Sequence, residues 1–291
     1  MKHPPIKQLL DVPAPAKINL FLHIVGRRAD GYHLLQSAFA LVNWADTLHF
    51  ENRPDGRIQR HDARQGSALP PEDLVVRAAK LLQAATQCPF GVDITLDKQL
   101  PLEAGLGGGS SDAASCLLAL NQLWGLHLPL QTLLPLAAQL GADVPFFVGG
   151  HSAWVEGIGE KLTPITLPES PILVVKPPSG ASTPAIFRHP DLQRDQKPAT
   201  IEDLFESSGS VFEFGQNALQ PVASSMCADI EVGLAWMCRQ GLQGRMTGSG
   251  TALFAACAEA LDCTQLQEKL PEGWVSKVCK ILNVHPLIGW R

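Results

Sequence analysis

The stretch Pro101-Leu-Glu-Ala-Gly-Leu-Gly-Gly-Gly-Ser-Ser-Asp-Ala-Ala-Ser115 carries the strongest local signal in the chain. Glycines stand at positions 105, 107, 108 and 109, and two serines follow them directly. Glycine lets the backbone adopt positive φ and approach a ligand closely. A helix is predicted from 113 to 124, and its unpaired N–H groups and positive dipole end face this loop. The pattern favours a phosphate site; the alternative is a mobile surface loop with a serine N-cap.

Other glycine motifs fit this stretch less well. The dinucleotide pattern G-x-G-x-x-G fails because Ser110 stands where the third glycine belongs. A Walker A loop needs a lysine before the serine, and Gly109 is there. The H-R-D and D-F-G motifs of protein kinases and the G-x-S-x-G motif of hydrolases are absent from the sequence. These four classes of site are therefore disfavoured.

A second segment, Leu140-Gly-Ala-Asp-Val-Pro-Phe-Phe, places Asp143 after the end of a helix predicted over 132–140. Apolar residues surround this carboxylate in the sequence. A carboxylate in such a place either caps a turn or takes part in chemistry. The residues alone leave both interpretations open.

A third segment, 17–25, alternates and predicts a strand. Lys17, Asn19 and Phe21 are expected on one face, with Ile18 and Leu20 on the other. An early lysine is usually solvated, but an ammonium beside a carboxylate would keep that carboxylate ionised.

A fourth segment, 246–254, contains a second glycine turn before a strand predicted over 252–257. The alternative interpretation of this segment is a plain tight turn.

The composition describes an ordinary globular chain. Its 291 residues suffice for two modest domains or one large one, and 45% are hydrophobic and 18% charged. The net charge of -5 gives no attraction to nucleic acid or to an acidic membrane, so a small-molecule substrate is expected. We expect neither a signal peptide nor a membrane span. The seven cysteines show no C-x-x-C spacing, which predicts reduced, mostly buried thiols in the cytoplasm.

The remaining elements are mixed rather than strictly alternating, which predicts an α+β fold. Strands are expected at 46–51, 92–96, 152–156, 172–175 and 274–281, and helices at 74–85, 216–227, 229–240 and 264–269. Asp73 is placed to cap the helix over 74–85. The segments 53–70 and 188–210 are predicted to be loops. A boundary near 165–170 divides the chain into domains 1–168 and 169–291.

Together and in this order, the motifs resemble the GHMP kinase superfamily of small-molecule kinases. Within it, three stretches resemble the branch that phosphorylates the 2-hydroxyl of 4-diphosphocytidyl-2-C-methyl-D-erythritol in non-mevalonate isoprenoid synthesis. They are 15–22 (PAKINLFL) with 28–33 (RADGYH), 140–147 and 183–187. The resemblance implies an N-terminal domain like ribosomal protein S5 with a left-handed βαβ unit, and a ferredoxin-like C-terminal domain.

The resemblance also implies ATP and Mg²⁺ as cofactors and a role for each motif residue. Asp143 would accept the proton of the substrate hydroxyl, and Lys17 would orient both groups. The ATP-binding residues would be Lys98, Pro101, Gly105, Leu106, Gly107, Gly108, Gly109, Ser110 and Ser111, and no protein metal-ligand set is expected. Tyr32 and Phe187 would stack on cytosine, and His33 would hydrogen-bond its edge. The substrate-binding set is completed by Asn19, Phe39, Thr183, Gly248 and Ser249.

Some features depart from the family pattern or stay open. Asp73 stands where the family usually has an asparagine near the adenine, and the segment 217–221 lacks two usual carboxylates. Thr183 could instead cap a helix that Pro184 begins.

The alternatives for function are another GHMP kinase, of the mevalonate or homoserine type, and a catalytically silent nucleotide-binding module. We expect a monomer or a weak homodimer.

Overall fold

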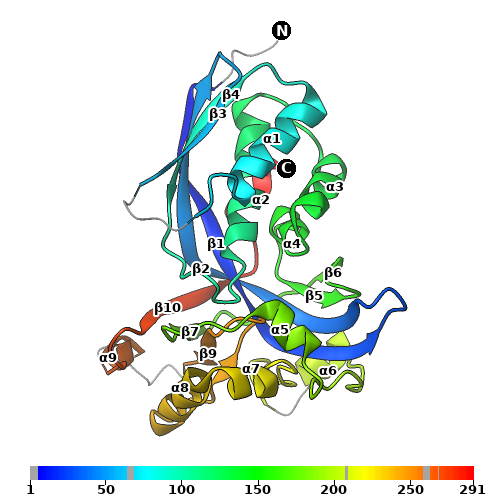
Figure 1. Ribbon diagram of the computed structural model, residues 1–291, viewed down its shortest axis with the longest axis vertical. Helices are drawn as coiled ribbons and strands as arrows, with labels where there is room; N and C mark the ends of the chain where they lie inside the picture. Colours follow the sequence, from blue (N-terminus) through cyan, green and yellow to red (C-terminus); the bar gives the residue numbers. More distant parts are fainter. Residues whose placement is uncertain (1–5, 64–68, 207–208, 258–262, 268) are drawn as a thin grey trace.

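Two long strands run through the molecule in the computed structural model, which describes residues 6–63, 69–206, 209–257, 263–267 and 269–291 (Figure 1). β1 (Gln8–Arg27) and β2 (His33–Arg53) are 20 and 21 residues long and pair antiparallel. They are joined by a tight turn in which Gly31 has a φ of 92°. This hairpin belongs to both halves of the molecule, so residues on it can face the space between the halves.

Within the described residues, ten strands form one mixed sheet. Its main path is β3-β4-β2-β10-β7-β9-β8, while β1 pairs along nearly the whole of β2, β5 pairs with residues 37–39 of β2, and β6 pairs with β5. The bounds are β3 Ile58–Asp62, β4 Gly91–Asp97, β5 Ala153–Glu156, β6 Lys161–Pro164, β7 Pro171–Lys176, β8 Arg245–Met246, β9 Leu253–Ala256 and β10 Val275–Leu282. The pair β3–β4 is parallel and is connected by α1 (Leu74–Thr86), which makes a βαβ unit in an otherwise antiparallel sheet.

Four helices cover one side of the β1–β4 part of the sheet, in the upper half of Figure 1. They are α1, α2 (Gly108–Leu123), α3 (Leu130–Leu140) and α4 (Val144–Gly149). The central α2 is buried along most of its length, because small residues such as Ala113 and Ala114 let the neighbouring elements pack closely around it. Its first turn is therefore held in a fixed position.

The lower half contains the other helices and the strands β7 to β9 (Figure 1). These helices are α5 (Thr183–Arg188), α6 (Ile201–Glu206), α7 (Gln220–Met226), α8 (Ala228–Arg239) and α9 (Cys263–Gln267). β10 ties the halves together, because it pairs with β7 and also with β2 through Ile281 and Leu282. The chain then returns to the upper half, where η1 (Ile288–Trp290) contacts α2 and the carbonyl of Trp290 accepts a hydrogen bond from Asn121 at 3.2 Å.

The helices predicted from apolar spacing are confirmed, with shifts of a few residues at their ends. The predicted cap of α1 is also confirmed, since the Asp73 carboxylate accepts the N–H of Val76 at 3.0 Å. The loop prediction for 53–70 is wrong at β3, a polar edge strand, and that for 188–210 is wrong at α6. Thr200 and Asp203 cap α6 reciprocally, a capping box that the sequence contains. The helix predicted from 113 begins at Gly108 instead.

The alternation predicted along 17–25 is broken by a β-bulge. The register of β1 against β2 shifts between Asn19 and Leu22. Lys17, Asn19 and Leu22 consequently line the same cavity, whereas Phe21, predicted to share the face of Lys17, is fully buried in the core. Because of the bulge, Leu22 rather than Phe21 faces the site described below.

The described cysteines depart from the prediction of reduced thiols, because they include a disulfide-bonded residue. Cys88, Cys116, Cys227, Cys238 and Cys279 are free, but Cys257 is disulfide-bonded. Cys116, Cys227 and Cys279 are buried and Cys238 is exposed. Across the described part of the chain, every helix is too short or too polar to cross a bilayer.

Candidate active site

The glycine-rich loop before α2 is shaped by two left-handed glycines. Gly105 has a φ of 78° and Gly107, which precedes the first turn of α2, has a φ of 72°. A Cβ on Gly107 would lie 3.0 Å from the ring of Phe147 and 3.2 Å from Cγ of Lys17. The backbone therefore comes close to Lys17, and the Lys17 N–H donates to the carbonyl of Leu106 at 2.9 Å.

The second glycine turn supports the first one. A Cβ on Gly250 would lie 2.2 Å from the carbonyl carbon of Ala104, and a Cβ on Gly248 would lie 2.6 Å from the oxygen of Gly105. The N–H of Ala252 donates to the oxygen of Ala104 at 3.2 Å. The plain-turn interpretation of 246–254 is therefore incomplete, because these glycines let two backbones pack against each other.

The two serines at the start of α2 have different environments. Ser111 is fully buried and its hydroxyl donates to the carbonyl of Pro15 at 2.6 Å, so it anchors α2 to β1. Ser110 lines the cavities on both sides of the loop. Of the two hydroxyls expected at a phosphate, the structure brings only that of Ser110 to the open space.

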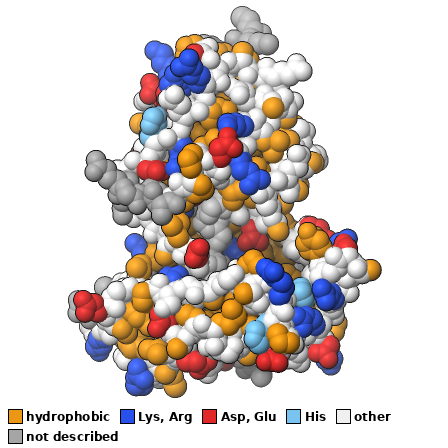
Figure 2. All heavy atoms as spheres, in the orientation of Figure 1, with side chains coloured by type: hydrophobic (Ala, Val, Ile, Leu, Met, Phe, Trp, Pro, Cys, Tyr) orange, Lys and Arg blue, Asp and Glu red, His pale blue; other side chains and the backbone are white. Residues whose placement is uncertain are grey.

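Lys17 and Asp143 meet in the space between the two halves, which is hollowed in the surface view (Figure 2). The Lys17 Nζ lies 3.7 Å from Oδ2 of Asp143. The lysine side chain is only 5% exposed, whereas that of Asp143 is 33% exposed. Asp143 directly precedes α4, but its side chain makes no capping bond to that helix. The turn-cap interpretation of Asp143 is therefore wrong, and its carboxylate faces the lysine and the cavity.

The ammonium of Lys17 is held by further contacts. It donates to Oδ1 of Asn19 at 2.5 Å and lies 4.4 Å from the ring centroid of Phe39. Asn19 donates through Nδ2 to Oγ of Ser37 at 2.9 Å, and Ser37 donates to the carbonyl of Phe21. This chain of contacts fixes the lysine, which leaves little freedom for its head group.

A cavity of about 340 Å³ joins these groups. Its lining includes the predicted site residues Lys17, Asn19, Phe39, Ser110, Asp143, Thr183, Phe187, Gly248 and Ser249. They come from β1, β2, α2, the start of α4, α5 and the second glycine turn, so segments far apart in sequence meet here. The Thr183 and Ser249 hydroxyls lie 2.7 Å apart across it. Ser182, not Thr183, precedes α5, so the alternative role of Thr183 as the cap is wrong.

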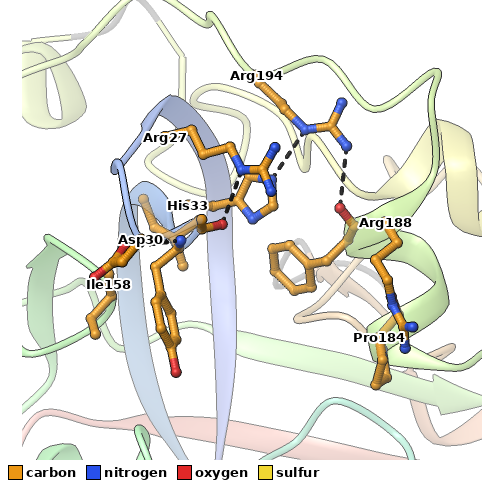
Figure 3. A pocket seen from close by; sticks show the side chains of 11 residues that line it. Arg27, Asp30, His33, Ile158, Pro184, Arg188 and Arg194 are labelled. Atoms are coloured by element: carbon orange, nitrogen blue, oxygen red, sulfur yellow. Dashed lines mark hydrogen bonds between the residues drawn. The ribbon is translucent and has the colours of Figure 1, made fainter.

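A larger cavity of about 880 Å³ adjoins the first through Leu35, Ile158 and Phe187. Tyr32 and His33 line it, with the tyrosine 60% exposed. The His33 and Phe187 rings lie 5.3 Å apart at an interplanar angle of 39°. Figure 3 shows that Arg27, Arg188 and Arg194 surround this space. The cavity therefore combines aromatic faces with positive charge.

Arg194 is a residue of this cavity that the sequence analysis missed. It lies in the segment predicted to be a loop, and its Nε donates to Nε2 of His33 at 3.1 Å (Figure 3). Burial first, and then the charges of Arg194 and Arg27, lower the pKa of His33, which favours the neutral imidazole at pH 7. No pattern in the sequence singles out this arginine among its charged neighbours.

A buried ionic cluster lies on the other side of the glycine loop. Lys98 donates to Asp46 and, at 2.8 Å, to Oδ2 of Asp112. Asp46 is fully buried and also accepts the backbone N–H groups of Gln99 and Leu100 at 2.6 and 2.7 Å. Burial raises the pKa of Asp112 to about 8, and the two carboxylates raise the pKa of Lys98 although burial opposes them. The expected nucleotide residue Lys98 is thus fixed by two carboxylates that the sequence analysis missed.

The loop lines two further cavities of about 290 Å³ each, which share Leu74, Lys98, Leu102 and Gly109. One contains the expected ATP-binding residues Pro101, Gly105, Leu106, Gly107, Gly108 and Ser110. Asp73 lines the other, where it also pairs with Arg60 at 2.8 Å. The loop cavity also shares Ser110 with the Lys17 cavity. The four cavities therefore form one continuous series, which runs from the cavity lined by Asp73 to the cavity lined by Tyr32.

Asn217 lies near the site without facing it. It is 3% exposed, and its Nδ2 donates to the carbonyls of Met246 and Gly248 at 2.9 Å each. The asparagine therefore supports the second glycine turn, which gives the segment 217–221 a structural role. In the described part of the chain, no three or more His, Cys, Asp or Glu side chains are grouped as metal ligands.

Comparison with known proteins agrees with this geometry. The family model for the GHMP kinases N terminal domain matches residues 73–151, which include the glycine loop and Asp143. A protein of Polaromonas naphthalenivorans named 4-diphosphocytidyl-2-C-methyl-D-erythritol kinase is 56% identical over 292 residues, covering 98% of this chain and 97% of the relative. A protein of the same name from Polaromonas sp. is 57% identical over 295 residues, with 98% and 95% covered.

Solved structures extend the comparison. The crystal structure of a 4-(cytidine 5'-diphospho)-2C-methyl-D-erythritol kinase superimposes with a TM-score of 0.78 at 34% identity, covering 94% of this chain and 98% of that one. L. major mevalonate kinase shares the fold at a TM-score of 0.69 and 15% identity, over 98% of this chain and 100% of that one. On these identities and coverages, the chain belongs to the 4-diphosphocytidyl-2-C-methyl-D-erythritol kinase family of the GHMP kinases.

Proposed function

We propose that the protein transfers the γ-phosphoryl group of ATP to the 2-hydroxyl of 4-diphosphocytidyl-2-C-methyl-D-erythritol, a step of non-mevalonate isoprenoid synthesis. The observation that carries this proposal is the placement of Lys17 and Asp143, 3.7 Å apart, in a cavity that also reaches the start of α2. A hydroxyl bound there lies between a carboxylate and a phosphate-binding loop. The names of the relatives supply the substrate.

In the proposed mechanism, Asp143 accepts the proton of the substrate hydroxyl. The bond from the substrate oxygen to phosphorus forms as the bond from phosphorus to the leaving oxygen of ADP breaks. Asp143 is suited to this role because its carboxylate is partly open to the cavity and is not used in capping. A positioned base of this kind contributes about 10²–10⁴-fold to the rate.

Lys17 would orient Asp143 and stabilise negative charge on the reacting oxygens. Its side chain is nearly buried and its head group is fixed by Asn19 and Phe39, so little reorganisation is needed during the reaction. Phosphoryl transfer depends mostly on positioning and on stabilisation of charge, and both are supplied here by groups with few alternative positions.

The glycine loop and the start of α2 would bind the ATP phosphates. Backbone N–H groups and the helix dipole favour negative charge at that end of α2. The hydroxyl of Ser110, which lines the cavity, would suit Mg²⁺, an ion that takes one or two protein ligands beside phosphates and water. Mg²⁺ bound with ATP would neutralise phosphate charge there.

The outer cavity would bind the cytidine diphosphate part of the substrate. Tyr32 and Phe187 offer aromatic faces for the base, His33 offers a polar ring edge, and three arginines give an environment suited to a diphosphate. Mevalonate and homoserine carry no base, and a cavity of this composition would serve no purpose for them. The kinase geometry of Lys17 and Asp143 likewise argues against a silent nucleotide-binding module.

We also infer the division into domains 1–168 and 169–291, with a left-handed βαβ unit in the first and a ferredoxin-like fold in the second. The parallel pair β3–β4 around α1 supports the first part. The described free thiols support a cytoplasmic location, although Cys257 is disulfide-bonded. A monomer or a weak homodimer stays a prediction, which light scattering at several protein concentrations would check.

A coupled ADP-release assay with ATP and Mg²⁺ tests the proposed function. The substrates are 4-diphosphocytidyl-2-C-methyl-D-erythritol and, as controls, mevalonate, homoserine and galactose. We expect turnover with the cytidylyl substrate and none with the controls. Turnover with a control alone would contradict the assignment of the outer cavity, and ATP binding without turnover on any of the four would support the silent module.

A further inference from the structure

Arg194 makes several contacts around the outer cavity. Its Nε donates to Nε2 of His33 at 3.1 Å, and its terminal nitrogens donate to the carbonyls of Leu192, Phe187 and His189 at 2.9, 3.2 and 2.9 Å. Figure 3 shows the guanidinium above the imidazole, with bonds running to both walls of the cavity. The three carbonyl contacts fix the guanidinium in place, so its direction towards His33 is fixed too.

This geometry determines which nitrogen of His33 carries the proton. A guanidinium can only donate hydrogen bonds, so Nε2 of His33 must accept. In a neutral imidazole with Nε2 as acceptor, the proton is on Nδ1. Burial and the neighbouring arginine charges lower the pKa of His33 and so favour this neutral form. Within the described residues, Nδ1 has no hydrogen-bond partner, and the side chain lines the cavity.

We propose that Arg194 is a positioning residue that makes the site prefer cytosine over uracil, by holding His33 with an N–H at Nδ1. The proposal rests on the proposed function, because it assumes that a pyrimidine base occupies the outer cavity. Position 3 of cytosine is a hydrogen-bond acceptor, whereas position 3 of uracil carries an N–H. The N–H at Nδ1 of His33 can donate a hydrogen bond to position 3 of cytosine. In uracil it would face another N–H, and no hydrogen bond would form.

Without Arg194, both neutral tautomers of His33 become available. The tautomer with the proton on Nε2 presents Nδ1 as an acceptor, which can pair with the N–H of uracil. Loss of Arg194 should therefore reduce the preference for cytosine. If Arg194 had a purely structural role, its loss would instead weaken the binding of cytosine and of uracil by the same factor.

Calorimetric binding of cytidine diphosphate and uridine diphosphate tests the proposal without requiring turnover. A saturating non-hydrolysable ATP analogue keeps both probes out of the ATP site. We expect the wild-type protein to bind cytidine diphosphate about tenfold or more tightly than uridine diphosphate, since one oriented base contact discriminates on that scale. In Arg194→Met we expect this ratio to fall towards one. Arg194→Lys, which keeps a donor for Nε2, should restore part of it.

Arg188→Gln is the matched control, because Arg188 lines the same cavity but donates through Nε to the carbonyl of Pro184 and not to His33. It should change the affinity for both diphosphates by the same factor and leave their ratio unchanged. An unchanged ratio in Arg194→Met, or no preference in the wild type, would overturn the proposal.

A second measurement does not depend on how well the Arg194 variants fold. The ¹⁵N shifts and long-range ¹H–¹⁵N couplings of His33 in the labelled wild-type protein identify its tautomer. We expect the proton on Nδ1, and a proton on Nε2 would overturn the proposal. The proposed function is tested separately, by turnover with the cytidylyl substrate. A protein with the expected tautomer but no turnover would contradict the proposed function and not the tautomer assignment, so the two failures can be told apart.

Discussion

Replacing Asp46 by asparagine should destabilise the protein and loosen the loop that leads to the phosphate site. Asp46 is fully buried and accepts from Lys98 and from the backbone N–H groups of Gln99 and Leu100. The amide of asparagine has one oxygen and would direct an NH₂ group at donors. With the amide oxygen in the place of Oδ1, the bonds from Gln99 and Leu100 can be retained, but the NH₂ group then faces the ammonium of Lys98, which loses a charged partner.

The magnitude follows from these contacts. Hydrogen bonds to a charged group contribute about 1.5–3 kcal/mol each, and breaking one partner of a buried pair costs about 3–5 kcal/mol. Asp112 still accepts a hydrogen bond from Lys98 at 2.8 Å, so the lower part of that range applies. For a chain above about 150 residues, each kcal/mol lowers Tm by about 2–4 °C, so Asp46→Asn should unfold about 6–12 °C below the wild type.

Thermal unfolding followed by circular dichroism measures this effect, and steady-state kinetics measure KM for ATP. We expect KM for ATP to rise more than KM for the second substrate, because Leu100 leads directly into the glycine loop. Asp30→Asn is the control, since Asp30 pairs with Arg28 at the surface, where such pairs contribute about 0–1 kcal/mol. If Asp46→Asn unfolds within about a degree of this control, the anchoring role is wrong.

Three further outcomes are expected. Because burial raises the pKa of Asp112 from about 4 in the unfolded chain to about 8, the folded state binds more protons between these values, and stability should fall as pH rises through that window. Chemical denaturation at several pH values should show this slope in the wild type and lose part of it in Asp112→Asn. Gly250→Ala places a Cβ 2.2 Å from Ala104 and should raise KM for ATP, whereas Gly289→Ala, with open space around it, should not. Phe187→Ala should raise KM for the cytidylyl substrate by about tenfold or more, measured at saturating ATP, because base stacking contributes about 1–3 kcal/mol.

The sequence predicts the elements whose signals are local. The apolar spacing of α1 and the cap by Asp73 are visible in a few residues, and the structure has both. β2 shows the opposite case: only its end, 46–51, was expected as a strand, because the residues before it are buried on both faces and do not alternate. β3 is polar because it lies at the sheet edge, and a polar edge strand resembles a loop in sequence.

The candidate site divides in the same way. The glycine loop is predicted from physical reasoning, whereas the meeting of Lys17 with Asp143 depends on the resemblance to a family and then on the fold. Asp46 and Arg194 could not be predicted, because their roles arise from contacts with residues 52 to 161 positions away. The bulge after Asn19 was hidden as well, since an alternating sequence does not reveal where the register shifts.

Single-turnover kinetics of Asp143→Asn with ATP, Mg²⁺ and 4-diphosphocytidyl-2-C-methyl-D-erythritol test the central claim most directly. The substitution keeps the shape of the side chain and removes its ability to accept the proton. We expect the rate of phosphoryl transfer to fall by about 10²–10⁴-fold, with the affinities for both substrates and the Tm little changed. A variant that transfers the phosphoryl group at close to the wild-type rate would contradict the role of Asp143 as the base.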